Sequence, residues 1–370
     1  MIYTKPDYFD EFYCIADKCP ATCCAGWQIM IDESSLQYYN NMTGAYGDVL
    51  RSHIDFTEAC FLQDANKRCA FLKENNLCDL YSHLGEESLC ATCTNYPRHV
   101  EEFENIREIT LSLSCPEVAR ILLSKTDPVS FFSEEAEEPE ETFEDYDPFF
   151  FSYLEDAREV LLHILQNRSL PIWVRYLLVL QFGQEMQDTI EHYELFDLVD
   201  LFDKYEDENY LSKAASNLEH QIETYRTDSA QTFSYGKSIF SFLYELEFLS
   251  DDWPDFLDSC WNTLYQNGAD VYQKMHADFR CYCETLSMDI ILEQLLVYFI
   301  FTYFCGAVYD DNVIGKIHLS LNSVFYLYEM FLAHWAEHDQ KITIQDMEKI
   351  SYRYSRELEH SDLNLEKMEG

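Results

Sequence analysis

Cysteines crowd the first third of this sequence of 370 residues. Ten of the fourteen cysteines lie before residue 116, and three of them fall within the stretch CPATCC at positions 19–24. Thiolates are good ligands of zinc and of iron–sulfur clusters, and in oxidising compartments they pair as disulfides. The spacing therefore indicates an inorganic centre, a disulfide framework, or a group of buried thiols that act as small apolar side chains.

The expected compartment favours the inorganic centre. The opening residues MIYTKPDYFD contain no apolar segment typical of a secretory signal, so we expect a cytoplasmic protein. Glutathione and thioredoxin keep thiols reduced in the cytoplasm, and a disulfide framework is not expected there. The early cysteines are therefore interpreted as metal or cluster ligands. The late ones are interpreted as buried apolar side chains: Cys260, Cys281, Cys283 and Cys305.

The early cysteines form two sets along the chain. The first set is Cys14, Cys19, Cys23 and Cys24; the second is Cys69, Cys78, Cys90 and Cys93, with Cys115 further on and Cys60 apart. Cys90 and Cys93 form a CxxC pair, whose spacing lets two sulfurs reach one centre. The adjacent pair Cys23–Cys24 fits a single zinc ion poorly, so it suggests either two centres or a separate role for one of the two.

Short, irregular elements must position these side chains. Residues 28–32 (QIMID) and 106–114 (IREITLSLS) alternate like strands, and residues 116–124 have the pattern of a helix. Beyond residue 148, apolar residues recur three and four apart, which predicts long helices. One of these helices is predicted over 171–193, because Pro171 is a favourable helix start.

Composition divides the chain into three parts. Residues 126–147 hold ten acids and no base, which predicts a solvated linker or an extended acidic strap. We predict a mainly α fold: an irregular cysteine-rich metal- or cluster-binding N-terminal module over 1–125, this acidic linker, and an α-helical domain over 148–370. The longest apolar run, 295–304, is shorter than the ~20 residues that cross a bilayer, so we expect a buried central helix and no transmembrane segment.

The charge limits the possible partners. A formal net charge of −43 repels nucleic acids and anionic lipid surfaces, and it attracts basic groups. Solubility alone explains such a charge equally well. The ten glycines include no G-x-G, so a Rossmann-type nucleotide site is not expected.

Five sequence blocks carry a resemblance to a known family. They are FYC-x4-C-x3-CC-x-GW-x-I-x-ID, C-x-FL, LC-x-LYSHLGEESL-x-x-TC-x-NYPR, SLSCPEVARILL and, at 354–365, YSRELEHSDLNL. In this order they resemble the flagellin lysine-N-methylase family. The N-terminal blocks are also similar to small bacterial proteins proposed to chelate zinc or iron through a CC-containing motif.

The resemblance implies a methyltransferase with an inorganic cofactor. It implies transfer of a methyl group from S-adenosylmethionine to the ε-amine of lysines on flagellin. It also implies a [4Fe–4S] cluster, with zinc as the alternative, at ligands drawn from Cys14, Cys19, Cys23, Cys24, Cys69, Cys78, Cys93 and Cys115. Cys90 departs from the pattern, because the family has serine at this point. Eight candidate ligands for four cluster positions leave room for a second metal.

Candidate catalytic residues lie near the end of the chain. A lysine amine must lose its proton before it attacks a methyl sulfonium, so a carboxylate or an imidazole should lie nearby. Glu357, Glu359 and His360 in RELEHSD are the candidates. At helical spacing Arg356 shares a face with His360, and Ser355 shares one with Glu359. The alternative is a solvent-facing terminal helix with ion pairs.

Candidate cofactor-binding residues are Tyr96, Arg98 and Arg356, because arginine binds carboxylates through two parallel hydrogen bonds. The alternative is that these arginines pair with some of the many acids. Two interpretations without methyl transfer also stay open. One is a zinc- or iron–sulfur-binding structural protein whose acidic face holds a basic partner. The other is a redox sensor that uses the CxxC pair.

Overall fold

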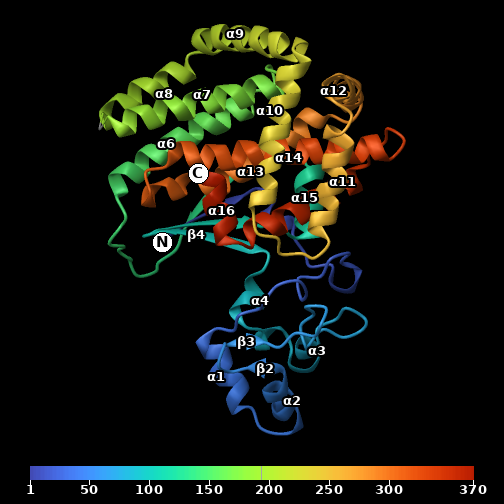
Figure 1. Cartoon of the computed structure of the whole chain (residues 1–370). Coiled ribbons are helices and arrows are strands. Elements are labelled where there is room, and N and C mark those ends of the chain that lie inside the picture. Colours follow the sequence, from blue (N-terminus) through green and yellow to red (C-terminus); the bar gives the residue numbers. More distant parts are fainter. Residues whose placement is uncertain (193) are drawn as a thin grey trace.

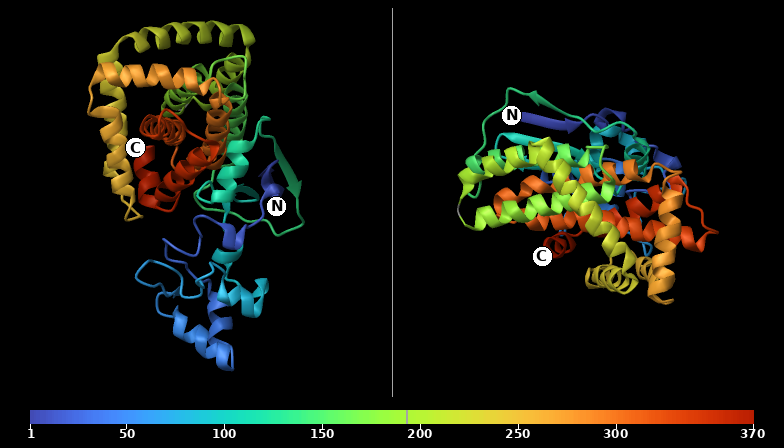
Figure 2. Two further views of the ribbon diagram at one scale, coloured as in Figure 1. Left: turned by 90° about the vertical axis from the view of Figure 1, so that its right-hand side faces the viewer. Right: turned by 90° about the horizontal axis from the view of Figure 1, so that it is seen from above.

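The computed structural model describes residues 1–192 and 194–370 and is mainly helical (Figure 1). Two separate hydrophobic cores define two bodies. A small core holds buried residues between 29 and 90, and a large core holds buried residues between 8 and 368. Figure 2 shows that the small body projects from one end of the helical body. The predicted mainly α fold with a helical C-terminal part is confirmed.

The small body consists of short elements. They are α1 (Glu33–Asn41), α2 (Ala45–His53), β2 (Ile54–Asp55), β3 (Cys60–Phe61), α3 (Asp79–Leu84) and α4 (Ala91–Asn95). The strand predicted over 28–32 is wrong, because Met30 forms only an isolated bridge with Cys60. The alternation has another cause: Ile29 and Ile31 both enter the small core.

A four-stranded sheet lies along the helical body (Figure 2). Its order is β4 (Arg98–Phe103), β5 (Ile106–Leu111), β1 (Ile2–Pro6) and β6 (Phe131–Glu135). Among the described residues only β1 and β5 pair in parallel. The predicted strand at 106–114 is confirmed as β5. The acidic segment 126–147 supplies β6, which pairs antiparallel with β1.

Helix α5 (Pro116–Ser124) confirms the helix predicted at 116–124. Residues 103–129 share the large core with the helices, although the sequence grouped most of them with the cysteine-rich module. Arg158 and Glu108 form a buried ion pair that ties β5 to the helical body. The sheet therefore belongs to the helical body in its packing.

The helical body is built from eleven further α-helices among the described residues. They are α6 (Pro148–Leu165), α7 (Ile172–Glu191), α8 (Leu198–Glu206), α9 (Glu208–Thr227), α10 (Ser229–Ser241), α11 (Trp253–Tyr265), α12 (Ala269–Cys283), α13 (Met288–Tyr303), α14 (Val313–Glu337), α15 (Ile344–Glu359) and α16 (Asp362–Glu369). The helix predicted over 171–193 is α7, and its last predicted residue, Tyr193, lies outside the described residues.

Helix α13 is the buried central helix that the sequence predicts. Among the described residues, Met288–Tyr309 is the one stretch long and apolar enough to cross a membrane by length and composition, and 83% of its most apolar window is buried inside the protein. Glu293 on this helix is fully buried between two guanidinium groups, at 2.7 Å from Arg175 and 2.8 Å from Arg168. These ion pairs hold α7 and the turn after α6 against α13.

Candidate functional site

A small pocket lies where the two bodies meet, and we call it the junction pocket. Its volume is about 50 Å³, and it is lined by Cys23, Ala25, Gly26, Trp27, Tyr96, Leu249, Ser250, Arg356 and His360. The fold thus brings together four residues that the sequence singled out separately: Cys23, Tyr96, Arg356 and His360. The ring of Trp27 lies 5.4 Å from that of His360 and 6.0 Å from that of Tyr96.

Arg356 joins distant segments at this pocket. Its Nε donates to the carbonyl of Ser114 at 2.9 Å, and its Nη2 donates to the carbonyl of Ala21 at 2.7 Å. The guanidinium thereby ties α15 both to the CPATCC loop and to the residue before Cys115. Two of its donors are occupied by backbone carbonyls, and both contacts stabilise the junction itself.

A chain of hydrogen bonds runs from His360 to Glu359. The Nε2 atom of His360 lies 3.0 Å from the hydroxyl of Ser114, which lies 2.6 Å from the hydroxyl of Ser112. Ser112 and Ser355 each donate to Glu359 Oε2 at 2.8 Å. Burial raises the pKa of Glu359, and burial followed by the charge of Arg356 lowers the pKa of His360 to about 4. The imidazole is therefore neutral at pH 7.

The remaining two predicted residues lie apart from this chain. Glu357 is buried and accepts hydrogen bonds from the amides of Leu249 and Ser250, at 2.7 and 3.0 Å, so it anchors the loop before α11. Arg98 is exposed and lies over the ring of Phe12, 5.8 Å from its centre. The three predicted cofactor-binding residues therefore do not lie at one site. Tyr96 and Arg356 line the junction pocket, and Arg98 does not.

Size limits what the junction pocket can hold. Pockets for drug-sized ligands and cofactors have volumes of roughly 300–1,000 Å³. The junction pocket, at about 50 Å³, has space for a water molecule or a small group and not for a nucleoside cofactor. As the structure stands, Tyr96 and Arg356 do not enclose a cofactor site.

Nine of the ten early thiols lie in two neighbourhoods, and the adjacent pair Cys23–Cys24 divides between them. Five thiols share the small core: Cys24, Cys69, Cys78, Cys90 and Cys93. The amide of Cys69 donates to the carbonyl of Cys24 at 2.8 Å. Burial raises the pKa of Cys69 to about 12, and the neighbouring thiols add to the rise. We call these five the small-core thiols.

The other neighbourhood faces the helical body and contains the junction thiols, Cys14, Cys19, Cys23 and Cys115. Burial raises the pKa of Cys115 to about 11, and Cys19 and Cys14 add to the rise. Burial also raises the pKa of Cys19, and the hydrogen bond to the carbonyl of Ala21, followed by the charge of Arg356, opposes this rise. Interaction with the neighbouring thiol, followed by burial, raises the pKa of Cys23, and the same interaction lowers that of Cys24 to about 7.

All fourteen cysteines are free thiols, so the disulfide framework is excluded as an arrangement of this structure. The two neighbourhoods have the donor chemistry that zinc and iron–sulfur clusters need. Within residues 1–192 and 194–370, however, no three cysteine, histidine, aspartate or glutamate side chains are placed to hold one metal ion. The thiols as placed do not fit a metal centre, and the metal-binding character predicted for the module is not confirmed.

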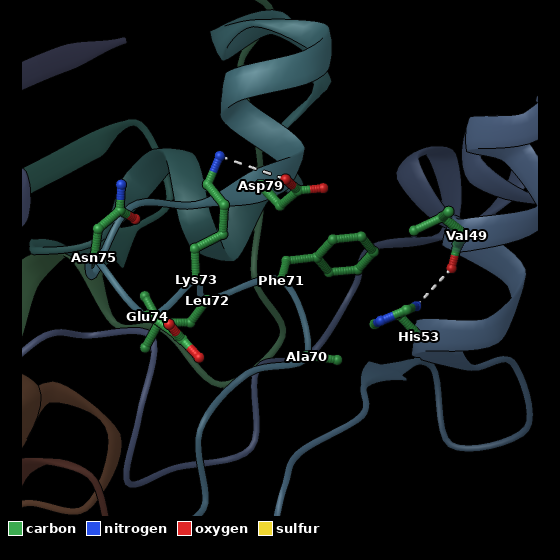
Figure 3. Close-up of a pocket in the computed structure, with 9 residues that line it drawn as sticks. All are labelled: Val49, His53, Ala70, Phe71, Leu72, Lys73, Glu74, Asn75 and Asp79. Atoms are coloured by element: carbon green, nitrogen blue, oxygen red, sulfur yellow. Dashed lines mark hydrogen bonds and ion pairs between the residues drawn. The ribbon is translucent and has the colours of Figure 1, made fainter.

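A broad groove lies on the small body, and the polar side chains that line it form no evident binding site (Figure 3). Its volume is about 710 Å³, and residues of α2, α3 and the loop between Ala70 and Asn75 line it. Lys73 lies 3.4 Å from Asp79, and the Nδ1 of His53 lies 2.8 Å from the carbonyl of Val49. These polar groups contact each other or the backbone, and the structure gives no convergent set of free groups here.

A second large pocket lies inside the helical body, and we call it the aromatic pocket. Its volume is about 540 Å³, and seven of its 17 lining residues are aromatic. They come from five helices: α7, α9, α10, α12 and α14. Trp173 and Tyr328 pack edge to face with ring centres 5.0 Å apart. Sequence patterns did not indicate this pocket, because the only signal was the aromatic content of helices that look like ordinary core helices.

A buried carboxylate lies behind the wall of the aromatic pocket. Glu329 is fully buried, and its Oε2 accepts hydrogen bonds from Tyr265 at 2.9 Å and from Tyr272 at 3.1 Å. Its Oε1 lies 2.9 Å from Nε2 of His276, but the two atoms are not in hydrogen-bonding geometry. Tyr272 and His276 line the pocket. A buried carboxyl group with one oxygen free of hydrogen bonds therefore lies one side chain away from the cavity.

The fold and these sites define a mainly helical protein in which a thiol-rich N-terminal body meets a helical body that contains an aromatic pocket. The chain belongs to the family described as the FliB lysine N-methylase C-terminal domain, whose model matches residues 158–370. The matched region includes the aromatic pocket and the predicted residues on and after α15. This confirms the resemblance found in the sequence.

Individual relatives match a shorter stretch. The chain is 30% identical over 132 residues to the lysine-N-methylase of Salmonella choleraesuis and 29% identical to that of Salmonella typhimurium; each match covers 34% of this chain and 33% of the relative. It is also 30% identical to the flagellar biosynthetic protein FliU of Salmonella muenchen, where the match covers 78% of the relative. The match therefore spans about a third of the length of the two lysine-N-methylases. No solved structure matches the chain.

Proposed function

We propose that this protein is an S-adenosylmethionine-dependent protein-lysine N-methyltransferase. One observation carries the proposal: the FliB lysine N-methylase model matches residues 158–370, more than half of the chain. Two relatives that carry the name lysine-N-methylase support it. When bound, S-adenosylmethionine supplies a methyl group on a sulfonium, and the C–S bond breaks as the lysine nitrogen forms its new C–N bond.

We propose flagellin as the substrate. One relative is named a flagellar biosynthetic protein, which links this kind of chain to the flagellum. The net charge of −43 supports a lysine-bearing partner, because an acidic surface attracts cationic segments and raises their association rate.

The chain offers two proton acceptors for the lysine. His360 is a neutral imidazole at the junction pocket, connected through Ser114 and Ser112 to Glu359. His276 in the aromatic pocket lies beside the buried carboxylate of Glu329. The ring nitrogen of an imidazole that carries no proton can accept one from the lysine ammonium.

The function is tested by incubating the purified protein with flagellin and S-adenosylmethionine, followed by mass spectrometry of the flagellin peptides. We expect methyl groups on lysines, absent when S-adenosylmethionine is omitted. Flagellin that stays unmodified under anaerobic, iron- and sulfide-replete conditions would contradict the proposal. A protein that binds flagellin without modifying it would support the alternative of a non-catalytic interaction protein.

The [4Fe–4S] cluster and the zinc alternative stay predictions. They depend on the family resemblance and on the donor chemistry of the two thiol neighbourhoods. Anaerobic metal and sulfide analysis tests them with Cys69→Ser for the small-core thiols, Cys115→Ser for the junction thiols and Cys260→Ser as the control in the helical body. Bound iron or zinc that is lost in one of the first two variants and kept in the control would support a centre in that neighbourhood.

A further inference from the structure

We infer that the aromatic pocket, and not the junction pocket, is the site of S-adenosylmethionine. This inference rests on the proposed function. It assigns the cofactor to residues of α7, α9, α10, α12 and α14, which the sequence did not single out. Four properties of the pocket carry it: its size, its aromatic walls, its two arginines and the buried carboxylate behind it.

Size is the first property. The aromatic pocket, at about 540 Å³, lies within the range of pockets that hold nucleoside-sized ligands. The junction pocket is smaller by an order of magnitude. A lysine side chain alone would leave most of the aromatic pocket empty, whereas a nucleoside with an amino-acid tail would occupy it.

The walls suit a purine and a cation. Aromatic faces from all five helices offer stacking surfaces for an adenine ring, and they attract a positively charged group through their ring quadrupoles. Gly236 lets α10 approach α12, because a Cβ at this position would lie 2.2 Å from the hydroxyl of Tyr272. That close approach helps to hold Tyr272 on Glu329.

Two arginines line the same cavity and suit a carboxylate. Arg226 contacts Glu223 on the outer side of α9, with 2.7 Å between the paired atoms. Arg280 on α12 has no carboxylate within ion-pair distance in the described part of the chain, which is unexpected in so acidic a protein. A guanidinium without a partner binds a ligand carboxylate through parallel hydrogen bonds.

The charges together select a zwitterionic ligand. The arginines suit an anionic end, and the buried Glu329, whose Oε1 accepts no hydrogen bond and lies 2.9 Å from Nε2 of His276, suits a cationic group near His276 and Tyr272. S-adenosylmethionine combines a carboxylate, a sulfonium and a purine. S-adenosylhomocysteine has the same shape without the positive sulfur, so the site should discriminate between the two.

Titration calorimetry tests the assignment with three variants. Arg280→Gln removes the free guanidinium, and Tyr235→Ala removes an exposed ring at the pocket. Lys274→Gln, an exposed substitution on the same helix α12 that does not line the pocket, is the matched control. Thermal unfolding of each variant establishes that it is folded.

We expect Arg280→Gln to weaken S-adenosylmethionine binding about ten- to hundredfold, because a hydrogen bond to a charged group is lost. Tyr235→Ala should also weaken binding, by about tenfold. Lys274→Gln should bind like the wild type. The wild type should prefer S-adenosylmethionine over S-adenosylhomocysteine.

Three results overturn the inference, in two different ways. Wild-type affinity in both pocket variants, with methyl transfer intact, would place the cofactor elsewhere and leave the proposed function standing. The same holds if the variants lose affinity for a lysine peptide and keep it for the cofactor. A wild-type protein that neither binds S-adenosylmethionine nor transfers a methyl group would overturn the inference together with the proposed function.

Discussion

At the residue scale, His360 shows how burial sets the chemistry of the junction. Its side chain lies between Trp27 and Ser114, and burial together with the charge of Arg356 lowers its pKa from 6.5 to about 4. Between these two pH values the unfolded chain binds a proton that the folded protein does not bind. The free energy of unfolding therefore decreases as the pH falls from 6.5 towards 4.

His360→Asn should remove this pH dependence. The shift corresponds to at most about 3 kcal/mol of unfolding free energy in the metal-free wild type, lost between pH 6.5 and 4. Urea unfolding of both proteins at several pH values measures the difference between their slopes. Parallel curves for wild type and variant would show that His360 titrates at its ordinary pKa in the folded protein.

At the element scale, the periodic spacing of apolar residues predicted individual helices and strands. The apolar spacing of α5, α7 and α13 and the alternation of β5 each matched the structure. The same face rule placed Ser355 against Glu359 on α15, where the hydroxyl donates to the carboxylate. These are interactions between residues close in the chain.

Such local patterns could not predict contacts between segments that are far apart in the chain. Residues 28–32 alternate because they enter a core, not because they pair along a strand. Tyr96 and Arg98 are two residues apart, yet only Tyr96 reaches the junction pocket, since β4 begins at Arg98 and carries it away. The aromatic pocket needs five helices packed together, and no single helix reveals it.

The buried Glu293 provides a test at this scale. Glu293→Leu should lower the unfolding free energy by about 3–5 kcal/mol, because Arg175 stays buried without its partner. Glu223→Gln, which breaks the exposed pair with Arg226, is the control and should change it by less than about 1 kcal/mol. Equal effects in urea unfolding would mean that the buried pair does not hold α13 in place.

The close contact between α10 and α12 at Gly236 allows a second test of helix packing. Gly236→Ala should lower the unfolding free energy by about 1–3 kcal/mol, because the new methyl group would displace Tyr272 from Glu329. Gly306→Ala is the matched control, since its Cβ would come no closer than 3.7 Å to the side chain of Lys316. A Gly236→Ala protein as stable as the wild type would show that α10 and α12 can move apart freely.

At the scale of the whole molecule, the excess of negative charge should affect the thermal stability. Sixty-eight acidic residues face 25 basic ones, so the folded chain repels itself. Added salt screens repulsion between exposed charges, since the Debye length falls from ~30 Å at 0.01 M to ~8 Å at 0.15 M ionic strength. The melting temperature should therefore rise as sodium chloride is added over this range. A melting temperature that is constant or falls would mean that attractive pairs outweigh the repulsion.

The hydrogen bond from Arg356 to Ala21 joins residues separated by 335 positions. On the ribosome, the segment that carries Ala21 emerges long before Arg356 is made. The small body must therefore spend most of the period of translation without the guanidinium that later fastens it to α15. During that interval the loop that carries Cys19 and Cys23 lacks the contact that fixes it against α15 in the finished protein.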